Sequence, residues 1–326
     1  MFSYRSILKK AWSIVIKNPY LWFFGLFASF LSVGAEYRIL VEPLSPKNSV
    51  DWYYRLGAMT QSGMWSSNTW HLMQNNPGRA LLVIFILLLT VAVSFFIVWL
   101  AVSSQLALVK NTEKIIKDKK DKDQGSFHFS LRAGSEKFWT AFAFTILSRV
   151  LISLLVLITA LPMLFPLRAS LALNIAFYIL FLLFIPIAIS VSLIIKYAIS
   201  FLVLKNKKFF VALEEAWKLF KNNWLISLEM GIILFAVSFV ATLAIIIGGL
   251  ILSIPFVILG AAFLQLFSFP FFWIITILGI ITLILFIILC GSILASYQII
   301  AWTDLFMRLN SKGAASKLER LVSAKK

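Results

Sequence analysis

Long apolar runs constrain this chain most strongly, because each is long enough to cross a lipid bilayer. A helix rises about 1.5 Å per residue, so about 20 apolar residues span a hydrocarbon core of roughly 30 Å. The chain is 61% hydrophobic and only 13% charged, whereas a soluble domain is about a quarter charged. The sequence therefore predicts an all-α, polytopic membrane helix bundle. Its six expected transmembrane helices lie at about 20–35, 80–109, 138–165, 171–204, 224–252 and 271–307.

The last apolar stretch, from Trp224 to Met307, is long enough for either two or three crossings. It contains only two charged residues, Glu229 and Asp304, and glycines and prolines interrupt its middle. Two crossings place most of the 30 Lys and Arg residues on the side of both termini, as the positive-inside rule requires. A third crossing would move the basic C-terminal tail to the other side. We therefore expect two helices, separated by a buried or interfacial segment near 255–268.

The same rule assigns the connections and the location. The loop 36–79 is expected to be external, the loop 110–137 cytoplasmic, and both termini cytoplasmic in a multi-pass protein of the bacterial inner membrane. Aromatic residues in the external loop are interpreted as an interfacial belt, with a ligand-recognition surface as the alternative. A net charge of +17 would suggest nucleic-acid binding in a soluble protein. Here the basic residues lie between apolar runs, so we expect no nucleic-acid partner.

Two short cytoplasmic stretches resemble each other, and each directly precedes a membrane helix. They are KKAWSIVIKN at 9–18 and EEAWKLFKNN at 214–223. In the second, apolar and charged residues occupy opposite helical faces, which is typical of a helix lying in the membrane interface. A weaker version, SLRAGSEKFW, precedes helix three at 130–139. The sequence therefore predicts amphipathic interfacial helices before helices one, three and five, in three repeated units. The identities between the first two stretches are Ala11/Ala216, Trp12/Trp217 and Asn18/Asn223.

Residues near the ends of these helices are candidates for anchoring the protein at the membrane surface. Tryptophan rings favour the headgroup region, and charged side chains can extend toward it. The interfacial anchors assigned on this basis are Trp12, Trp217, Trp302, Asp304 and Arg308.

Three charged residues lie within the expected spans and form the candidate polar site: Arg149, Lys196 and Glu229. An ionisable residue inside a bilayer is costly, so it is a candidate for function. One interpretation is a polar pathway or substrate-coordinating site, in which depth makes Glu229 a partner for Lys196. The other is structural: Lys196 and Asp304 extend to the interface, while Arg149 and Glu229 pair and hold their helices in register.

No motif of an enzyme or a cofactor site is present. The chain has no Walker-type loop, HExxH or GxSxG sequence. It contains one cysteine, Cys290, and two histidines, His71 and His128, without the spacing of metal ligands. We therefore expect no catalytic, cofactor-binding or metal-binding residues, and no enzymatic activity.

The segment from 196 to 234, KYAISFLVLKNKKFFVALEEAWKLFKNNWLISLEMGIIL, carries a family resemblance. It resembles the membrane domain attached to some bacterial glycerophosphodiester phosphodiesterases, and the stand-alone relatives of that domain. The segment YQIIAWTDLFMRL at 297–309 is similar to the family's closing segment, through Trp302, Asp304 and Arg308. The resemblance implies a six-helix membrane domain. The segments flanking the spans are too short for the family's catalytic domain, so hydrolase activity is not expected. The matching residues in the first segment are Ala212, Leu213, Ala216, Trp217, Lys221 and Asn223.

Two functions remain open. The first is a non-enzymatic inner-membrane protein that organises lipid or a protein partner, as the amphipathic helices and missing motifs indicate. The second is a small-molecule or lipid transporter that uses Arg149, Lys196 and Glu229. Membrane lipids are the expected partners, with a protein partner or a second copy of the chain as alternatives.

Overall fold

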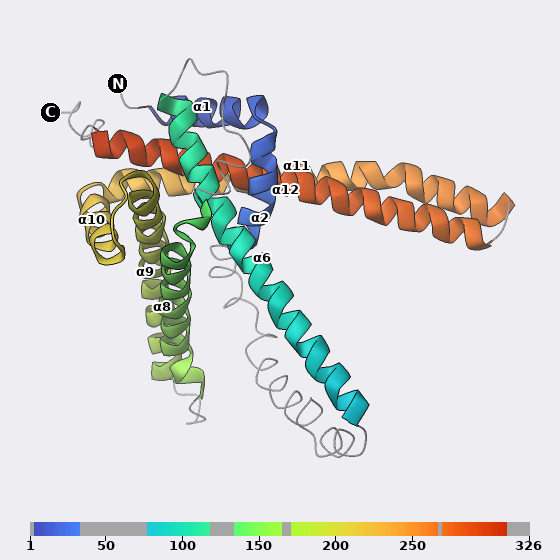
Figure 1. Ribbon diagram of the computed structural model, residues 1–326, viewed down its shortest axis with the longest axis horizontal. Coiled ribbons are helices and arrows are strands. Elements are labelled where there is room, and N and C mark those ends of the chain that lie inside the picture. Colours follow the sequence, from blue (N-terminus) through green and yellow to red (C-terminus); the bar gives the residue numbers. More distant parts are fainter. Residues whose placement is uncertain (1–2, 33–76, 118–133, 165–170, 267–268, 312–326) are drawn as a thin grey trace. The chain divides into compact units, whose positions relative to one another are not determined.

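The computed structural model describes residues 3–32, 77–117, 134–164, 171–266 and 269–311, which form helices and short connections without a strand (Figure 1). The predicted all-α class is therefore confirmed for this part of the chain. Its helices, in chain order, are α1 (Tyr4–Lys17), α2 (Tyr20–Ser32), α6 (Pro77–Lys117), α8 (Phe138–Leu164), α9 (Leu171–Leu204), α10 (Phe209–Asn222), α11 (Trp224–Leu266) and α12 (Phe269–Ser311).

Five of these helices are long and apolar enough to cross a membrane, which makes the chain a multi-pass integral membrane protein. The sixth expected span, 20–35, corresponds to α2, which has 13 residues. Such a helix is about 20 Å long, shorter than a hydrocarbon core. Residues 33–35 lie outside the described part, so the number of six spans stays a prediction. The candidate spans are Leu81–Lys117, Phe138–Leu155, Leu182–Leu204, Trp224–Leu264 and Pro270–Ser311.

Helices α6 and α11 extend furthest beyond their predicted ends. Helix α6 continues to Lys117, so the first turns of the predicted cytoplasmic loop 110–137 belong to it. Helix α11 continues through Pro255 to Leu266, so the separate segment expected at 255–268 is wrong up to that residue. The physical reason is the cost of unpaired backbone groups in an apolar environment, which favours a continuous helix even where proline removes one donor. Residues 118–133, and most of the predicted external loop 36–79, lie outside the described part.

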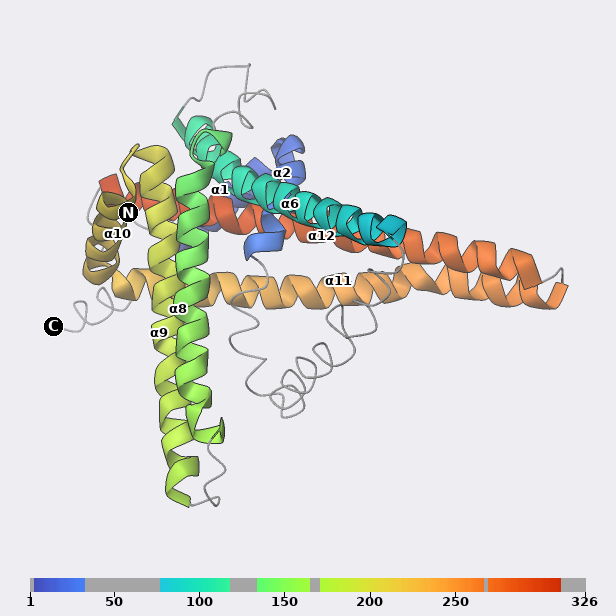
Figure 2. The same cartoon turned by 60° about the horizontal axis from the view of Figure 1, so that its bottom comes forward.

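Glycines in α11 and α12 allow these two helices to pack closely toward the end of α11 and the start of α12 (Figure 2). A Cβ added at Gly279 would lie 2.9 Å from the Cβ of Phe256, and one at Gly248 would lie 3.1 Å from the Phe286 ring. Small residues commonly permit such approaches between membrane helices. The glycines that interrupt the apolar stretch therefore serve packing and do not end the helix.

The chain divides into two compact units, of which the first contains Met1–Leu31, Ala101–Ile152 and Ser190–Lys326. In this unit Tyr197 and Ala198 of α9 are at most 1% exposed, as are Ile300 and Ala301 of α12. These residues form its core. The second unit contains Ser32–Leu100 and Ser153–Ile189.

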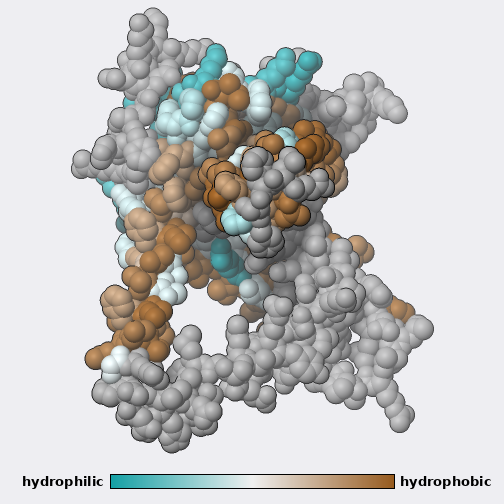
Figure 3. Space-filling model, turned by 90° about the vertical axis from the view of Figure 1, so that its right-hand side faces the viewer, coloured by the Kyte–Doolittle hydropathy of each residue, from teal (hydrophilic) through white to brown (hydrophobic). Residues whose placement is uncertain are grey.

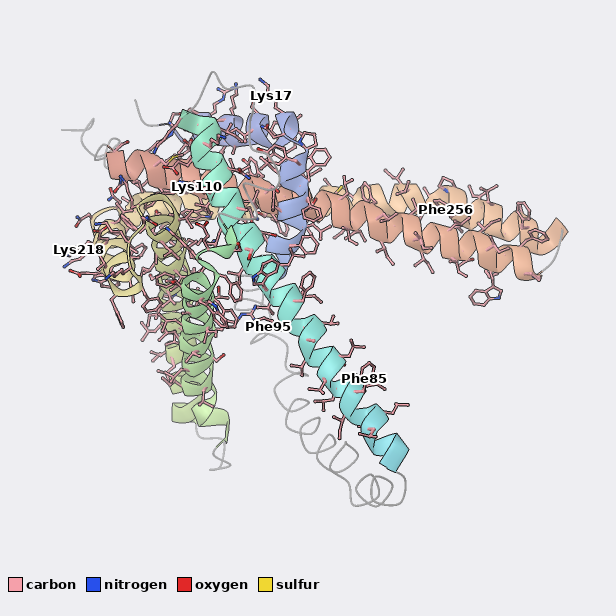
Figure 4. All side chains as sticks on the ribbon, viewed as in Figure 1. Lys17, Phe85, Phe95, Lys110, Lys218 and Phe256 are labelled. Carbon is pink, nitrogen blue, oxygen red and sulfur yellow. The ribbon has the colours of Figure 1, made fainter. Side chains whose placement is uncertain are left out.

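Most large apolar side chains of the long helices are not covered by protein. Phe85 and Phe95 of α6 are 65% and 50% exposed and project from the helix (Figure 4). On the face shown in Figure 3, hydrophobic residues cover much of the described surface, and hydrophilic residues gather in smaller areas. A surface of this kind is suited to contact with lipid chains.

Candidate functional site

Asp304 of α12 is the centre of a buried ionic contact with α1. The residue is only 2% exposed, and its Oδ2 lies 3.0 Å from Arg308 Nη2 and 3.1 Å from Arg308 Nε. Its Oδ1 lies 3.8 Å from Lys10 Nζ. Arg308 Nη1 also donates a hydrogen bond of 2.9 Å to the Ser6 hydroxyl. Two cations therefore compensate one buried carboxylate, and both connect α12 with α1.

The local sequence explains this arrangement. Asp304 and Arg308 are four residues apart on α12, so they share one helical face. On α1, residues such as Ile7, Ala11 and Val15 are completely buried, and the helix packs on α12 through this face. Lys10 lies beside the apolar face and reaches the carboxylate.

A second set of polar contacts joins α1, α9, α11 and α12. The Tyr4 hydroxyl donates to Glu229 Oε2, and the hydroxyls of Tyr197 and Ser227 are 2.7 Å apart. Lys196 Nζ lies 5.0 Å from the centre of the Trp302 ring, at a distance at which a cation is attracted to an aromatic face. We call these residues, together with Lys10, Asp304 and Arg308, the polar cluster.

The structure places two of the three predicted intramembrane charges in this cluster. Lys196 and Glu229 are half-buried, and the Tyr197–Ser227 hydrogen bond connects their helices close to both. Arg149 is exposed on α8 and makes no hydrogen bond or ion pair with the residues that the structure describes. Glu229 accepts a hydrogen bond from Tyr4, and within the described residues the alternative pairing of Arg149 with Glu229 is not found.

The predicted interfacial anchors fall into two groups. Trp12 and Trp217 are each 54% exposed, whereas Trp302 is 8% and Asp304 2% exposed. The prediction that Trp302 and Asp304 meet the membrane surface is therefore corrected. Trp302 packs edge-on against Tyr197, and Asp304 needs its two cations, so both belong to the interior. Arg308 is half-buried between Asp304 and Ser6.

Helices α1 and α10 have the same local structure. Their bounds, Tyr4–Lys17 and Phe209–Asn222, keep the spacing of the sequence match, and each has 14 residues. Ala11 and Ala216 are both completely buried. The amide Nδ2 of Asn18 donates to the carbonyl of Ile14 at 2.8 Å, and that of Asn223 to the carbonyl of Leu219 at 3.1 Å. The two matching stretches therefore share one helical structure, whereas their place in the membrane interface and the third unit stay predictions. Part of the third stretch, 130–133, lies outside the described residues.

Lys137, the residue directly before α8, fixes the turn that precedes α10. Lys137 Nζ donates to the carbonyl of Leu202 at 2.7 Å and to the side-chain oxygen of Asn206. Asn206 has a φ of 58°, a left-handed conformation that asparagine tolerates. Burial, followed by the nearby charge of Lys110, lowers the pKa of Lys137. A lysine thus holds the end of α9 and positions α10.

Ion pairs neutralise part of the charge on α10. Lys218 Nζ lies 2.6 Å from Glu214, and Lys207 Nζ lies 2.9 Å from Glu215. The hydrogen bond between Glu214 and Lys218 lowers the pKa of Glu214 and raises the pKa of Lys218. Figure 4 shows Lys218 on the outer side of α10. The sequence of α1, by contrast, contains no acidic residue.

Sequence reasoning identified Lys196, Glu229 and Asp304, but missed Tyr4, Ser6 and Tyr197. No local pattern marks these residues, because their partners come from distant segments of the chain. No protein-family model matches the chain, and comparisons with curated proteins and with solved structures give no match.

Proposed function

We propose that this protein is a non-enzymatic component of the bacterial inner membrane that organises lipid, with α1 and α10 in the cytoplasmic headgroup layer. One observation carries the proposal. Both helices leave a tryptophan and basic residues uncovered by protein directly before the chain enters an apolar helix. Tryptophan favours the headgroup region, and lysine and arginine are attracted to anionic lipid.

The opposite faces of these helices support the same function. Ala11 and Ala216 are completely buried, and the Asn18 and Asn223 side chains bond back to their own helices. The buried alanines pack on the rest of the protein, so each helix keeps one rotation about its axis and its exposed face keeps a fixed direction. A surface fixed in this way can order lipids around the protein.

Replacing both exposed tryptophans, by Trp12→Ser and Trp217→Ser, is expected to reduce bound lipid and leave the protein folded. The reason is that more than half of each side chain lies outside the protein core. Native mass spectrometry of gently extracted protein measures the bound lipid. Trp273→Ser is the matched control, since Trp273 is 50% exposed but lies on α12. Wild-type protein that carries a stoichiometric protein partner and no lipid would contradict the proposal.

The second candidate is a transporter of a small molecule or lipid, which the half-buried Lys196 and Glu229 in the polar cluster favour. Arg149 lies outside the polar cluster, so replacing it measures only the cost of its charge inside the bilayer. Arg149→Leu is expected to raise the free energy of unfolding by about 1–3 kcal/mol, because an arginine among lipid chains is costly. Thermal unfolding in detergent measures this change. Bound lipid should remain in this variant. A specific small molecule that the wild type binds and Glu229→Gln does not bind would favour transport.

We also propose that the chain is related to the membrane domain attached to some glycerophosphodiester phosphodiesterases. The order α9, short turn, α10 and α11 supports this relationship. It carries no hydrolase activity to the present chain.

A further inference from the structure

We infer that the exposed face of α1 binds the headgroups of anionic phospholipids, and that its repeat copy α10 has lost most of this preference. The inference rests on the proposed lipid-organising function and specifies which lipid each copy selects. Arg5, Lys9, Trp12 and Ile16 are all exposed. Their spacing of four, three and four residues places them on one helical face. We call this the basic face of α1.

The cations of the basic face are available for binding. Within the described part of the chain, Arg5 and Lys9 form no ion pair, and the same holds for the exposed Lys17 at the end of α1 (Figure 4). Lys10 is excluded, because it lies toward Asp304. An indole ring with two cations beside it matches a phospholipid headgroup, since the ring lies at the boundary of the apolar region and the cations meet the phosphate.

The same face of α10 has a different chemistry. The repeat places Phe210 and Glu214 where α1 has Arg5 and Lys9. Phe210 is 80% exposed, and Glu214 is paired with Lys218. The two positions that carry cations one and two turns before Trp12 therefore carry no cation before Trp217. Lys221, one turn beyond Trp217, retains a single exposed positive charge on this face.

The two copies therefore contact the same surface in different ways. On α1, electrostatic attraction adds to the burial of Trp12, so its contact with lipid depends on headgroup charge. On α10, Phe210 and Trp217 supply apolar contact that is indifferent to that charge. The protein would gather anionic lipid at one helix and remain bound to any bilayer through the other.

Quenching of tryptophan fluorescence by brominated phospholipids tests the inference on the full chain in vesicles. Brominated phosphatidylglycerol and brominated phosphatidylcholine are compared at equal fractions. The chain has 11 tryptophans, so the signals of Trp12 and Trp217 are taken as differences between the wild type and Trp12→Phe or Trp217→Phe. One lysine or arginine near the surface contributes a preference for anionic lipid of roughly fivefold. For Trp12, which has two cations on its face, we therefore expect a preference well above that of a single cation. For Trp217, whose face keeps only Lys221, the ratio should be clearly lower.

Two charge variants complete the test. Arg5→Gln with Lys9→Gln should reduce the Trp12 ratio to near one, and Glu214→Lys should raise the Trp217 ratio. Equal quenching of Trp12 by both lipids in the wild type would overturn the inference and leave the proposed function intact. If neither lipid quenches either tryptophan, the proposed function fails as well. A Trp217 ratio equal to that of Trp12 would overturn the difference between the copies.

Discussion

Gly25→Ala is expected to lower the free energy of unfolding by about 3 kcal/mol, the upper range for adding volume to a packed interior. A Cβ at this position would overlap the Ser296 hydroxyl and the carbonyl of Ser292, both on α12. The carbonyl belongs to a helix backbone and cannot move without displacing the helix. A shift of α2 would also break the 3.0 Å hydrogen bond that the Ser296 hydroxyl donates to the carbonyl of Leu21. Thermal unfolding in detergent, followed by circular dichroism, measures the loss.

Two other glycines provide matched controls for this substitution. A Cβ at Gly231 of α11 or at Gly291 of α12 would meet no atom of the described residues within 4 Å. Alanine there should leave stability unchanged or raise it by up to about 1 kcal/mol through its higher helix propensity. Equal unfolding temperatures for Gly25→Ala and Gly291→Ala would show that α2 does not pack on α12 at Gly25.

The long helices could be predicted because a membrane-spanning helix requires only sufficient length and an apolar sequence. The same runs did not reveal where α11 ends, since Pro255 and the glycines near it break a helix in water. In an apolar environment the backbone has no alternative partner, so α11 continues to Leu266. The glycines are explained by contacts such as Gly279 with Phe256, and these depend on a neighbouring helix that a local pattern cannot identify.

Only some residues of the polar cluster could be predicted from the sequence. The cost of a charge inside a bilayer marked Lys196 and Glu229, and both contribute to the cluster. The position of a residue along a helix gives its depth in the bilayer, but not the side of the helix on which its side chain lies. Arg149 was therefore grouped with Lys196 and Glu229, although it is exposed on α8. The same limit led to the assignment of Asp304 to the membrane surface.

The repeat was predictable for a different reason. Three identities at constant spacing marked α1 and α10, and the structure adds equal lengths and equivalent asparagine hydrogen bonds. A short helix followed by an asparagine step is a local structure, so the sequence encodes it locally. The sequence does not show that α1 packs on α12, because this contact joins the two ends of the chain.

Asp304→Ala is expected to lower the free energy of unfolding by about 3 kcal/mol and to loosen α1. Removing one partner of a buried ion pair costs about 3–5 kcal/mol, and the lower value applies because both cations can regain some water. The side chains of Lys10 and Arg308 are 39% and 30% exposed, against 3% for Asp304. Thermal unfolding measures the loss of stability. Limited digestion with trypsin should become faster at Arg5, Lys9 and Lys10 as α1 detaches.

An exposed ion pair serves as a control, because it shows how much of the stability loss at Asp304 depends on burial of the carboxylate. Glu214→Ala removes the partner of Lys218 on the surface of α10 and should leave the unfolding temperature unchanged, since exposed pairs contribute little. Asp304→Asn can still accept a hydrogen bond from Arg308, so its loss should be smaller than that of Asp304→Ala. If both substitutions at Asp304 leave tryptic cleavage of α1 unchanged, the apolar face with Ile7 and Ala11 holds the helix alone. The ionic contact would then determine only the register of α1 on α12.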